Sequence, residues 1–226
     1  MKALAALAFS LVLAFPAAAL ELDGNLEQGG LVIGKAVPGA TAVLDGTVLD
    51  IDEDGIFAFG LDRDHGTTAK LVVNLPGGEI LERNLSIAPR EWKIQSVEGV
   101  PQKFVTSPPE AMEAIARSTR VKNEARKTRA EGSWFREGFI WPATGPISGV
   151  FGSQRYYNGD PRPPHYGVDV AAPTGTPIVA PAGGVVTLAD MDMYFEGGLV
   201  FLDHGQGVTS LMMHMSRIDV KAGDRV

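Results

Sequence analysis

Short apolar runs separated by glycine-containing turns dominate the first half of the chain, and they favour short strands over long helices. The turns stand at Pro38-Gly39, Asp45-Gly46, Asp54-Gly55 and Pro76-Gly77-Gly78, and the apolar runs cover residues 31–33, 41–44, 47–49, 56–59 and 70–73. Asp45-Gly46 between two such runs is a strong signal for a two-residue hairpin. A turn every ~10 residues predicts a small β-sandwich of about six or seven strands over residues 20–100.

Composition narrows the class of protein further. The chain has 226 residues, is 45% hydrophobic and contains no cysteine. The hydrophobic content is sufficient for the chain to bury a core. The absence of cysteine excludes a disulfide scaffold, a Cys-ligated metal and a catalytic thiol. The net charge of −7 argues against non-specific nucleic-acid binding. Residues 20–100 carry 14 acidic and 6 basic side chains, whereas residues 101–226 carry 13 of each, so the acidity belongs to the first module.

One acidic segment resembles half of a calcium loop. Residues 50–55 read Asp-Ile-Asp-Glu-Asp-Gly, but Leu61 stands where that loop requires a bidentate glutamate. The flanking runs are strands rather than helices. An acidic hairpin turn is therefore the prediction for this segment.

Residues 1–19 read as a secretory signal peptide. Lys2 precedes an apolar run from Ala3 to Phe15, and Ala17-Ala18-Ala19 supplies the small residues of a cleavage site. A membrane anchor is the rival interpretation, but the run falls short of the ~20 residues that a spanning helix needs. We expect an exported protein without a membrane span, located in the periplasm or secreted.

Residues 101–133 are predicted to form a linker and a basic helix. Ser107 can cap the helix, Pro108 suits its first turn, and the helix is expected over residues 109–130. Its basic side chains predict either a solvated connector or a docking surface for the acidic module, for envelope polymers or for envelope protein partners. The sequence leaves these alternatives open.

His165 and Asp169 are the first candidates for a metal site. Four residues apart on a strand, both side chains would point to one face, and Gly167, Val168 and Val170 favour a strand here. Imidazole nitrogen and carboxylate oxygen together suit zinc. Two ligands alone do not define a site, because many strands place such a pair for hydrogen bonding.

The surrounding blocks resemble a known family. Phe151-Gly-Ser-Gln-Arg155, His165-x-x-x-Asp169, Gly175-Thr-Pro-Ile-Val-Ala180, Asp203-His-Gly205 and His214-Met-Ser216 follow in order, ending in Gly223-Asp-Arg-Val226. The run is similar to the lysostaphin/LytM-type zinc metallopeptidases, which cut the peptide cross-links of peptidoglycan. It covers about residues 139–226.

The resemblance implies a fold, a cofactor and roles for three residues. The chain would be mostly β, with an antiparallel β-sheet peptidase domain over residues 134–226 following the sandwich and the helix. His165 and Asp169 would be zinc ligands, and His214 would be the non-ligand histidine that binds substrate or stabilises the transition state. His204 would shape a hairpin turn without binding the metal. The substrate would be the stem peptides of peptidoglycan.

The family's third zinc ligand has no counterpart in this sequence. In the family it lies in a His-x-His motif beyond the Gly-Asp-x-Val block, and the four histidines here stand at 65, 165, 204 and 214. We expect that the chain is a fragment whose reading frame continues into that motif, and that the 226-residue form is itself inactive. The alternatives are a non-catalytic activator of other cell-wall hydrolases and an envelope binding module.

Overall fold

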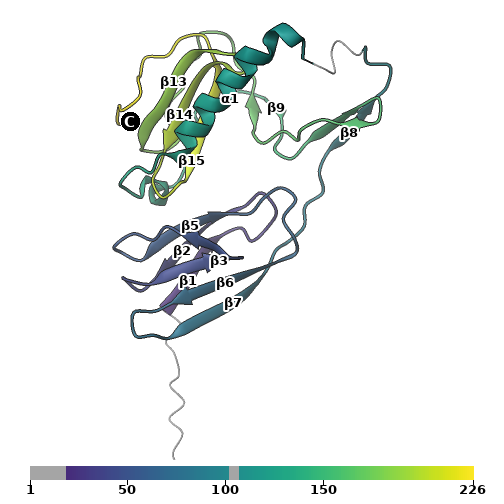
Figure 1. Cartoon of the computed structure of the whole chain (residues 1–226). Helices are drawn as coiled ribbons and strands as arrows, with labels where there is room; N and C mark the ends of the chain where they lie inside the picture. Colours follow the sequence, from purple (N-terminus) through teal and green to yellow (C-terminus); the bar gives the residue numbers. More distant parts are fainter. Residues whose placement is uncertain (1–18, 102–106) are drawn as a thin grey trace, which may run out of the picture.

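The computed structural model describes residues 19–101 and 107–226, and it divides them into a sandwich and a C-terminal part (Figure 1). The prediction of a mostly β chain with one main helix is confirmed. The predicted signal peptide falls almost wholly outside the described residues, as do residues 102–106 of the predicted linker. Within the described ranges, no helix combines the length and the apolar character needed to cross a bilayer.

The sandwich consists of two antiparallel sheets. One has the order β1 (Leu20–Gly24), β2 (Leu31–Ala36) and β5 (Ile56–Gly60), and the other has the order β4 (Thr47–Leu49), β3 (Thr41–Leu44), β6 (Thr68–Asn74) and β7 (Ile80–Ser86). All five apolar runs singled out in the sequence lie in these strands. The seven strands agree with the predicted number.

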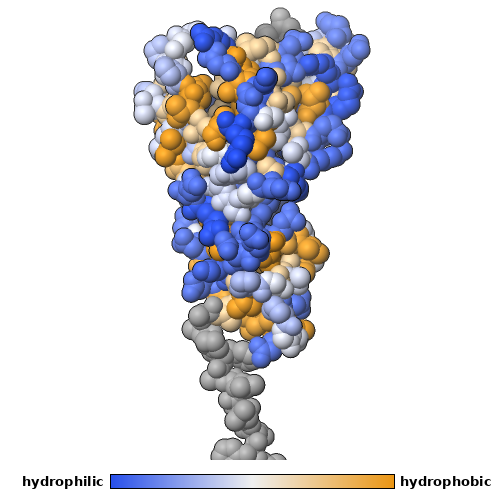
Figure 2. Space-filling model, turned by 90° about the vertical axis from the view of Figure 1, so that its left-hand side faces the viewer, coloured by the Kyte–Doolittle hydropathy of each residue, from blue (hydrophilic) through white to orange (hydrophobic). Residues whose placement is uncertain are grey.

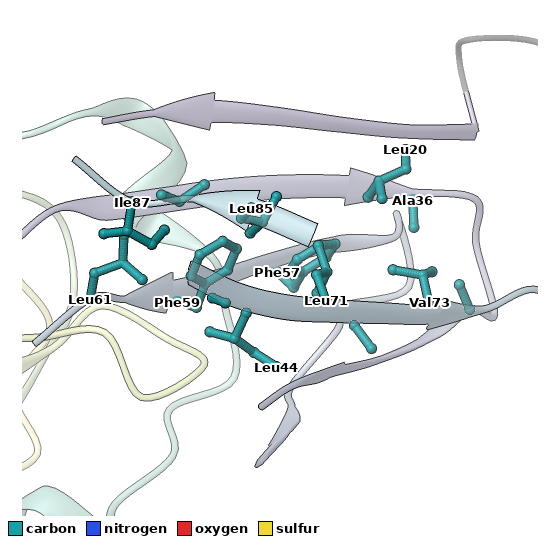
Figure 3. Close-up of a cluster of buried hydrophobic side chains, with 14 residues drawn as sticks. Leu20, Ala36, Leu44, Phe57, Phe59, Leu61, Leu71, Val73, Leu85 and Ile87 are labelled. Carbon is teal, nitrogen blue, oxygen red and sulfur yellow. The ribbon is translucent and has the colours of Figure 1, made fainter. Parts of the chain in front are cut away.

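Side chains from both sheets meet in one apolar core (Figure 3). Val32, Phe57 and Leu71 are fully buried there. Gly34 makes room for the Phe57 ring, because a Cβ at that position would lie 2.1 Å from a ring carbon. The alternation of buried and exposed residues along β6 places every second side chain in this core.

The predicted hairpin at Asp45-Gly46 is confirmed. Leu44 pairs with Thr47, so the turn has two residues, and both have positive φ angles of 46° and 84°. Positive φ at both central positions is the mark of the tight turns that match strand twist.

The C-terminal part contains a further antiparallel sheet and two smaller ones. The main sheet has the order β13 (Val185–Met193), β14 (Gly197–Asp203) and β15 (Thr209–Met215). β9 (Ile147–Gly149) pairs with β12 (Asp169–Val170), and β10 (Gln154–Tyr157) lies between β11 (Asp160–Pro161) and β8 (Ile94–Val97). β8 runs parallel to β10, so residues assigned above to the acidic module supply a strand to the C-terminal part.

The basic helix is shorter than predicted. A 3-10 turn, η3 (Pro109–Ala111), leads into α1 (Met112–Lys127), and no side chain caps either start, so the expected cap by Ser107 is wrong. The helix ends three residues before the predicted Ala130 because Thr128 turns extended and the Ala130 amide donates to Asp203 Oδ2 at 2.8 Å. A tertiary hydrogen bond therefore decides where the helix ends.

α1 lies against the main sheet and is not a free connector (Figure 1). Ala125 is buried with Met193, Leu199 and Phe201, and the Tyr194 amide donates to the Ser118 hydroxyl at 3.0 Å. Val186, Val200 and Leu202 form a second cluster with other partners. Neighbouring residues of β14 thus divide between two clusters, as alternation along a strand requires.

The sandwich meets the C-terminal part through the acidic turn at residues 50–55. Asp52 Oδ1 accepts from the amides of Asp54 and Ile56, which confirms a hairpin turn, and Asp52 Oδ2 accepts from the Ser133 hydroxyl at 2.7 Å. Arg136, in η4 (Trp134–Glu137), pairs with Asp54 at 3.1 Å. Figure 2 shows hydrophilic residues gathered across the middle of the molecule, and apolar patches above and below.

Candidate active site

His165 is held by its backbone on both sides. Its amide donates to the Ser153 carbonyl and its carbonyl accepts from the Gly152 amide, each at 2.8 Å. Its ring Nδ1 lies 3.2 Å from the Val150 carbonyl. Because a carbonyl only accepts, Nδ1 is the donor of this hydrogen bond, and histidines that bind a metal through Nε2 are commonly oriented by such a contact.

The Nε2 atom of His165 lies 3.2 Å from Asp169 Oδ1. Two ligand atoms of a tetrahedral zinc ion are about 3.3 Å apart, so the pair fits two corners of such a site. A cation placed between Nε2 and Oδ1 would contact both atoms. The side chains are 31% and 54% exposed, so the pair is open to solvent.

The two residues do not share a strand, contrary to the sequence prediction. β12 contains only Asp169 and Val170, and His165 belongs to the loop before it. Pro163 and Pro164 precede the histidine and lack the amides that a strand ladder needs. The contact between His165 and Asp169 is made instead by the loop that carries His165, which is hydrogen-bonded to the turn at residues 150–153.

Gly149 makes the space that the Asp169 carboxylate occupies. The two residues are cross-strand neighbours in β9 and β12. A Cβ on Gly149 would lie 2.1 Å from Asp169 Oδ2. Sequence reasoning gave Gly149 no role in the site, although the glycine-rich run from Gly145 to Gly152 is the signal that could have indicated it.

His214 lies on another sheet, in a strained conformation. Its φ is +61°, its side chain is exposed, and its amide donates to the Glu196 carbonyl at 2.9 Å. The register of β14 and β15 shifts here, since Gly198 faces Met215 while Val200 faces Met212. A bulge with a non-glycine residue at positive φ is typical of positions that aim a functional side chain.

The His204 side chain contributes to the packing of the fold. It is fully buried, and its two ring nitrogens lie 2.6 Å from the Gly183 carbonyl and 2.8 Å from the Ser210 hydroxyl. Both nitrogens are engaged by the protein, so neither is available to a metal. The ring packs edge-on against Phe139 beside the turn that follows it.

The structure brings His165 and Asp169 together, and His214 lies in a strand of another sheet. In residues 19–101 and 107–226 no group of three His, Cys, Asp or Glu side chains is arranged to hold a metal. Among the described residues the arrangement therefore offers His165 and Asp169 as two candidate ligands, and the expected zinc site stays a prediction. Glu196, which sequence reasoning missed, fixes the backbone of His214 while its own side chain is buried against Lys122.

Residues 163–226 match the model of peptidase family M23. The chain carries an M23 peptidase domain. His165, Asp169 and His214 all lie within the matched residues, and β8, α1 and the sandwich lie before them.

Relatives of the M23 domain include an uncharacterized metalloprotease of Haemophilus influenzae, 41% identical, and the peptidoglycan DD-endopeptidase ShyA of Vibrio cholerae, 38% identical. Each match covers 63 residues and 28% of this chain, but only 13% and 14% of the respective relatives. A crystal structure from Pseudomonas aeruginosa assigned to peptidase M23 is 28% identical, with a TM-score of 0.65, over 89% of this chain and 79% of that one. That similarity extends beyond the M23 domain into the N-terminal residues.

Proposed function

We propose that this protein is an exported zinc endopeptidase that cuts the peptide cross-links of peptidoglycan. The observation that carries the proposal is the His165–Asp169 pair, which presents Nε2 and Oδ1 3.2 Å apart inside an M23 domain. ShyA, a relative of that domain, is named for the same reaction class. The signal-like residues 1–19 support export to the compartment that holds this substrate.

His165 and Asp169 would hold the metal, through Nε2 and Oδ1. A bound zinc ion polarises a carbonyl and lowers the pKa of a bound water. The Val150 carbonyl keeps the proton of His165 on Nδ1, and Gly149 leaves the Asp169 carboxylate free to turn toward the same point. Both ligands are thereby oriented before any metal arrives.

His214 would act on the substrate. An exposed imidazole can donate a hydrogen bond to the oxyanion that develops on an amide carbonyl, or take up a proton. Its strained backbone is held by the Glu196 carbonyl, so the ring direction is set by the bulge in β15. The solvent exposure of His165 and Asp169 suits a flexible peptide substrate better than a small molecule in a closed pocket.

The test compares His165→Ala with His65→Ala in protein made from the complete reading frame. His65 belongs to the sandwich and pairs with Asp45, so it is a matched control. We expect one zinc per chain and release of cross-link fragments from purified peptidoglycan for the parent and for His65→Ala. Both should be lost in His165→Ala. No zinc in the parent, or unchanged digestion by His165→Ala, would contradict the enzyme and favour the non-catalytic activator.

A further inference from the structure

Arg63 is a buried cation that reaches from the sandwich into the C-terminal part. The residue is only 7% exposed, and its Nε donates to the Gly152 carbonyl at 2.8 Å. A second nitrogen of the guanidinium lies 3.3 Å from Gln154 Oε1, and a third pairs with Asp64 at 2.5 Å. Burial of an arginine is unfavourable unless its donors are bonded, so these contacts define one orientation of the side chain.

The turn that accepts this bond is the same turn that holds His165. The Gly152 amide donates to the His165 carbonyl, and the His165 amide donates to Ser153. Val150, at the start of the turn, offers its carbonyl to the His165 ring. A bond to the Gly152 carbonyl therefore constrains the segment on which both the backbone and the ring of His165 depend.

Trp92 lies close both to Arg63 and to this turn. The Arg63 guanidinium lies 5.2 Å from the centre of the Trp92 ring. Gly152 has a φ of +82°, and a Cβ there would lie 2.0 Å from a Trp92 ring carbon. The turn thus contacts an arginine and a tryptophan that both lie outside the M23 match.

We infer that Arg63 is a positioning residue for the metal ligand His165. The inference rests on the proposed function, because it concerns the ligand of that site. It assigns a role to the sandwich, which would hold one wall of the active site in place from a distant part of the sequence. Removal of groups that orient metal ligands typically weakens metal affinity by about 10- to 100-fold.

The experiment compares Arg63→Met with Arg90→Met in protein made from the complete reading frame. Methionine keeps an unbranched apolar stem but removes every donor. Arg90 also stacks on Trp92, at 4.8 Å, yet its hydrogen bonds go to Gln28 in the sandwich, so it is a matched control. The readouts are zinc affinity, measured by competition with a chromophoric chelator, and amide hydrogen exchange at Gly152 and His165.

We expect Arg63→Met to bind zinc about 10-fold more weakly or worse. Its Gly152 and His165 amides should exchange faster, while core amides such as that of Leu71 keep the parent rate. Arg90→Met should match the parent in both readouts. Parent-like zinc affinity in Arg63→Met would overturn the inference while leaving the enzyme intact.

Two further outcomes are decisive. If His165→Ala binds zinc as tightly as the parent, the proposed function fails, and the exchange data alone then decide whether Arg63 orders the turn. If Arg63→Met does not fold, Arg63→Lys, which retains the charge and one donor group, replaces it. Failure of both variants to fold would overturn the inference, because Arg63 would then serve the fold and not the ligand.

Discussion

His165 and His214, two residues of the candidate site, differ in backbone strain. His165 has ordinary surroundings for a metal ligand, with its backbone bonded on both sides and its ring oriented by a carbonyl. His214 is held in a conformation that its backbone disfavours, at a φ of +61°. Strain of this kind persists only where the neighbouring structure imposes it, here the Glu196 carbonyl and the bulge of β15.

Substitutions at His214 should separate stability from activity. Glycine tolerates positive φ and alanine does not, so His214→Gly should be more stable than His214→Ala by about 1 kcal/mol. Both lack the imidazole, so both should digest peptidoglycan about 100-fold more slowly than the parent, or worse. Thermal unfolding and a digestion assay measure the two effects. Equal stability of the two variants would show that the strain at residue 214 is relieved in solution.

α1 illustrates an element whose position could not be read from its composition. Its apolar residues are few, and sequence reasoning therefore left open a solvated connector. Polar contacts do much of the anchoring: Arg117 pairs with Asp190 at 2.7 Å, Lys122 pairs with Glu196, and Arg126 lies 5.5 Å from the Phe201 ring. Each partner is brought to the helix by the folding of β13 and β14.

The Lys122–Glu196 pair should matter far more than an exposed pair on the same helix. Its side chains are 17% and 10% exposed, and Glu196 Oε2 is buried without a hydrogen-bond partner among the residues that the structure describes. Removal of one member of a buried pair leaves an uncompensated charge, so Lys122→Met should destabilise by about 3 kcal/mol. Lys127→Met, which breaks a pair 70% and 64% exposed, should cost about 0.5 kcal/mol or less. Urea unfolding measures both.

The double variant Lys122→Met/Glu196→Leu distinguishes charge burial from packing. If the loss comes from the unpaired carboxylate, the second substitution should recover most of the stability. A double variant as unstable as Lys122→Met alone would instead assign the loss to the contacts of the lysine stem.

The whole molecule is joined by polar contacts between the sandwich and the C-terminal part. Gln206 donates to the Ile56 carbonyl at 3.0 Å and to the Ser133 hydroxyl at 3.1 Å, and Ser133 in turn donates to Asp52. Arg129 and Arg136 pair with the aspartates of the same acidic turn. Some of the acidic side chains of the sandwich thus form ion pairs with arginines that follow α1 in the chain.

A double-mutant cycle should detect the link between the two parts. Asp52→Ala also removes the bonds within its own turn, so the single variant overstates the contact with Ser133. The cycle with Ser133→Ala isolates that contact, and we expect a coupling free energy of about 1 kcal/mol in urea unfolding. Arg136→Gln should destabilise the protein by less than this, and the destabilisation should disappear at high salt because the ion pair with Asp54 is partly exposed. A coupling near zero would show that the contact between Asp52 and Ser133 adds nothing to stability.

Local patterns explain how much of the fold could be predicted. The strands of the sandwich and the turn at Asp45-Gly46 follow from alternation and turn chemistry, both of which act within a few residues. The contact between His165 and Asp169 was expected from their spacing, although the strand expected to carry it was not formed. The end of α1 and the pairing of β8 with β10 depend on distant residues, and no local pattern indicates them.

The sequence by itself determined a mostly β chain, the acidic character of its first module and the residues that form the M23 blocks. These are properties of composition, spacing and order along the chain. Only the tertiary structure decided that Arg63 bonds the turn behind His165, that Glu196 holds His214, and that α1 packs on the main sheet. Each of these joins residues far apart in the sequence. The first two use backbone groups that every residue carries, and the third uses side chains of α1 and the sheet that only the folded chain brings together.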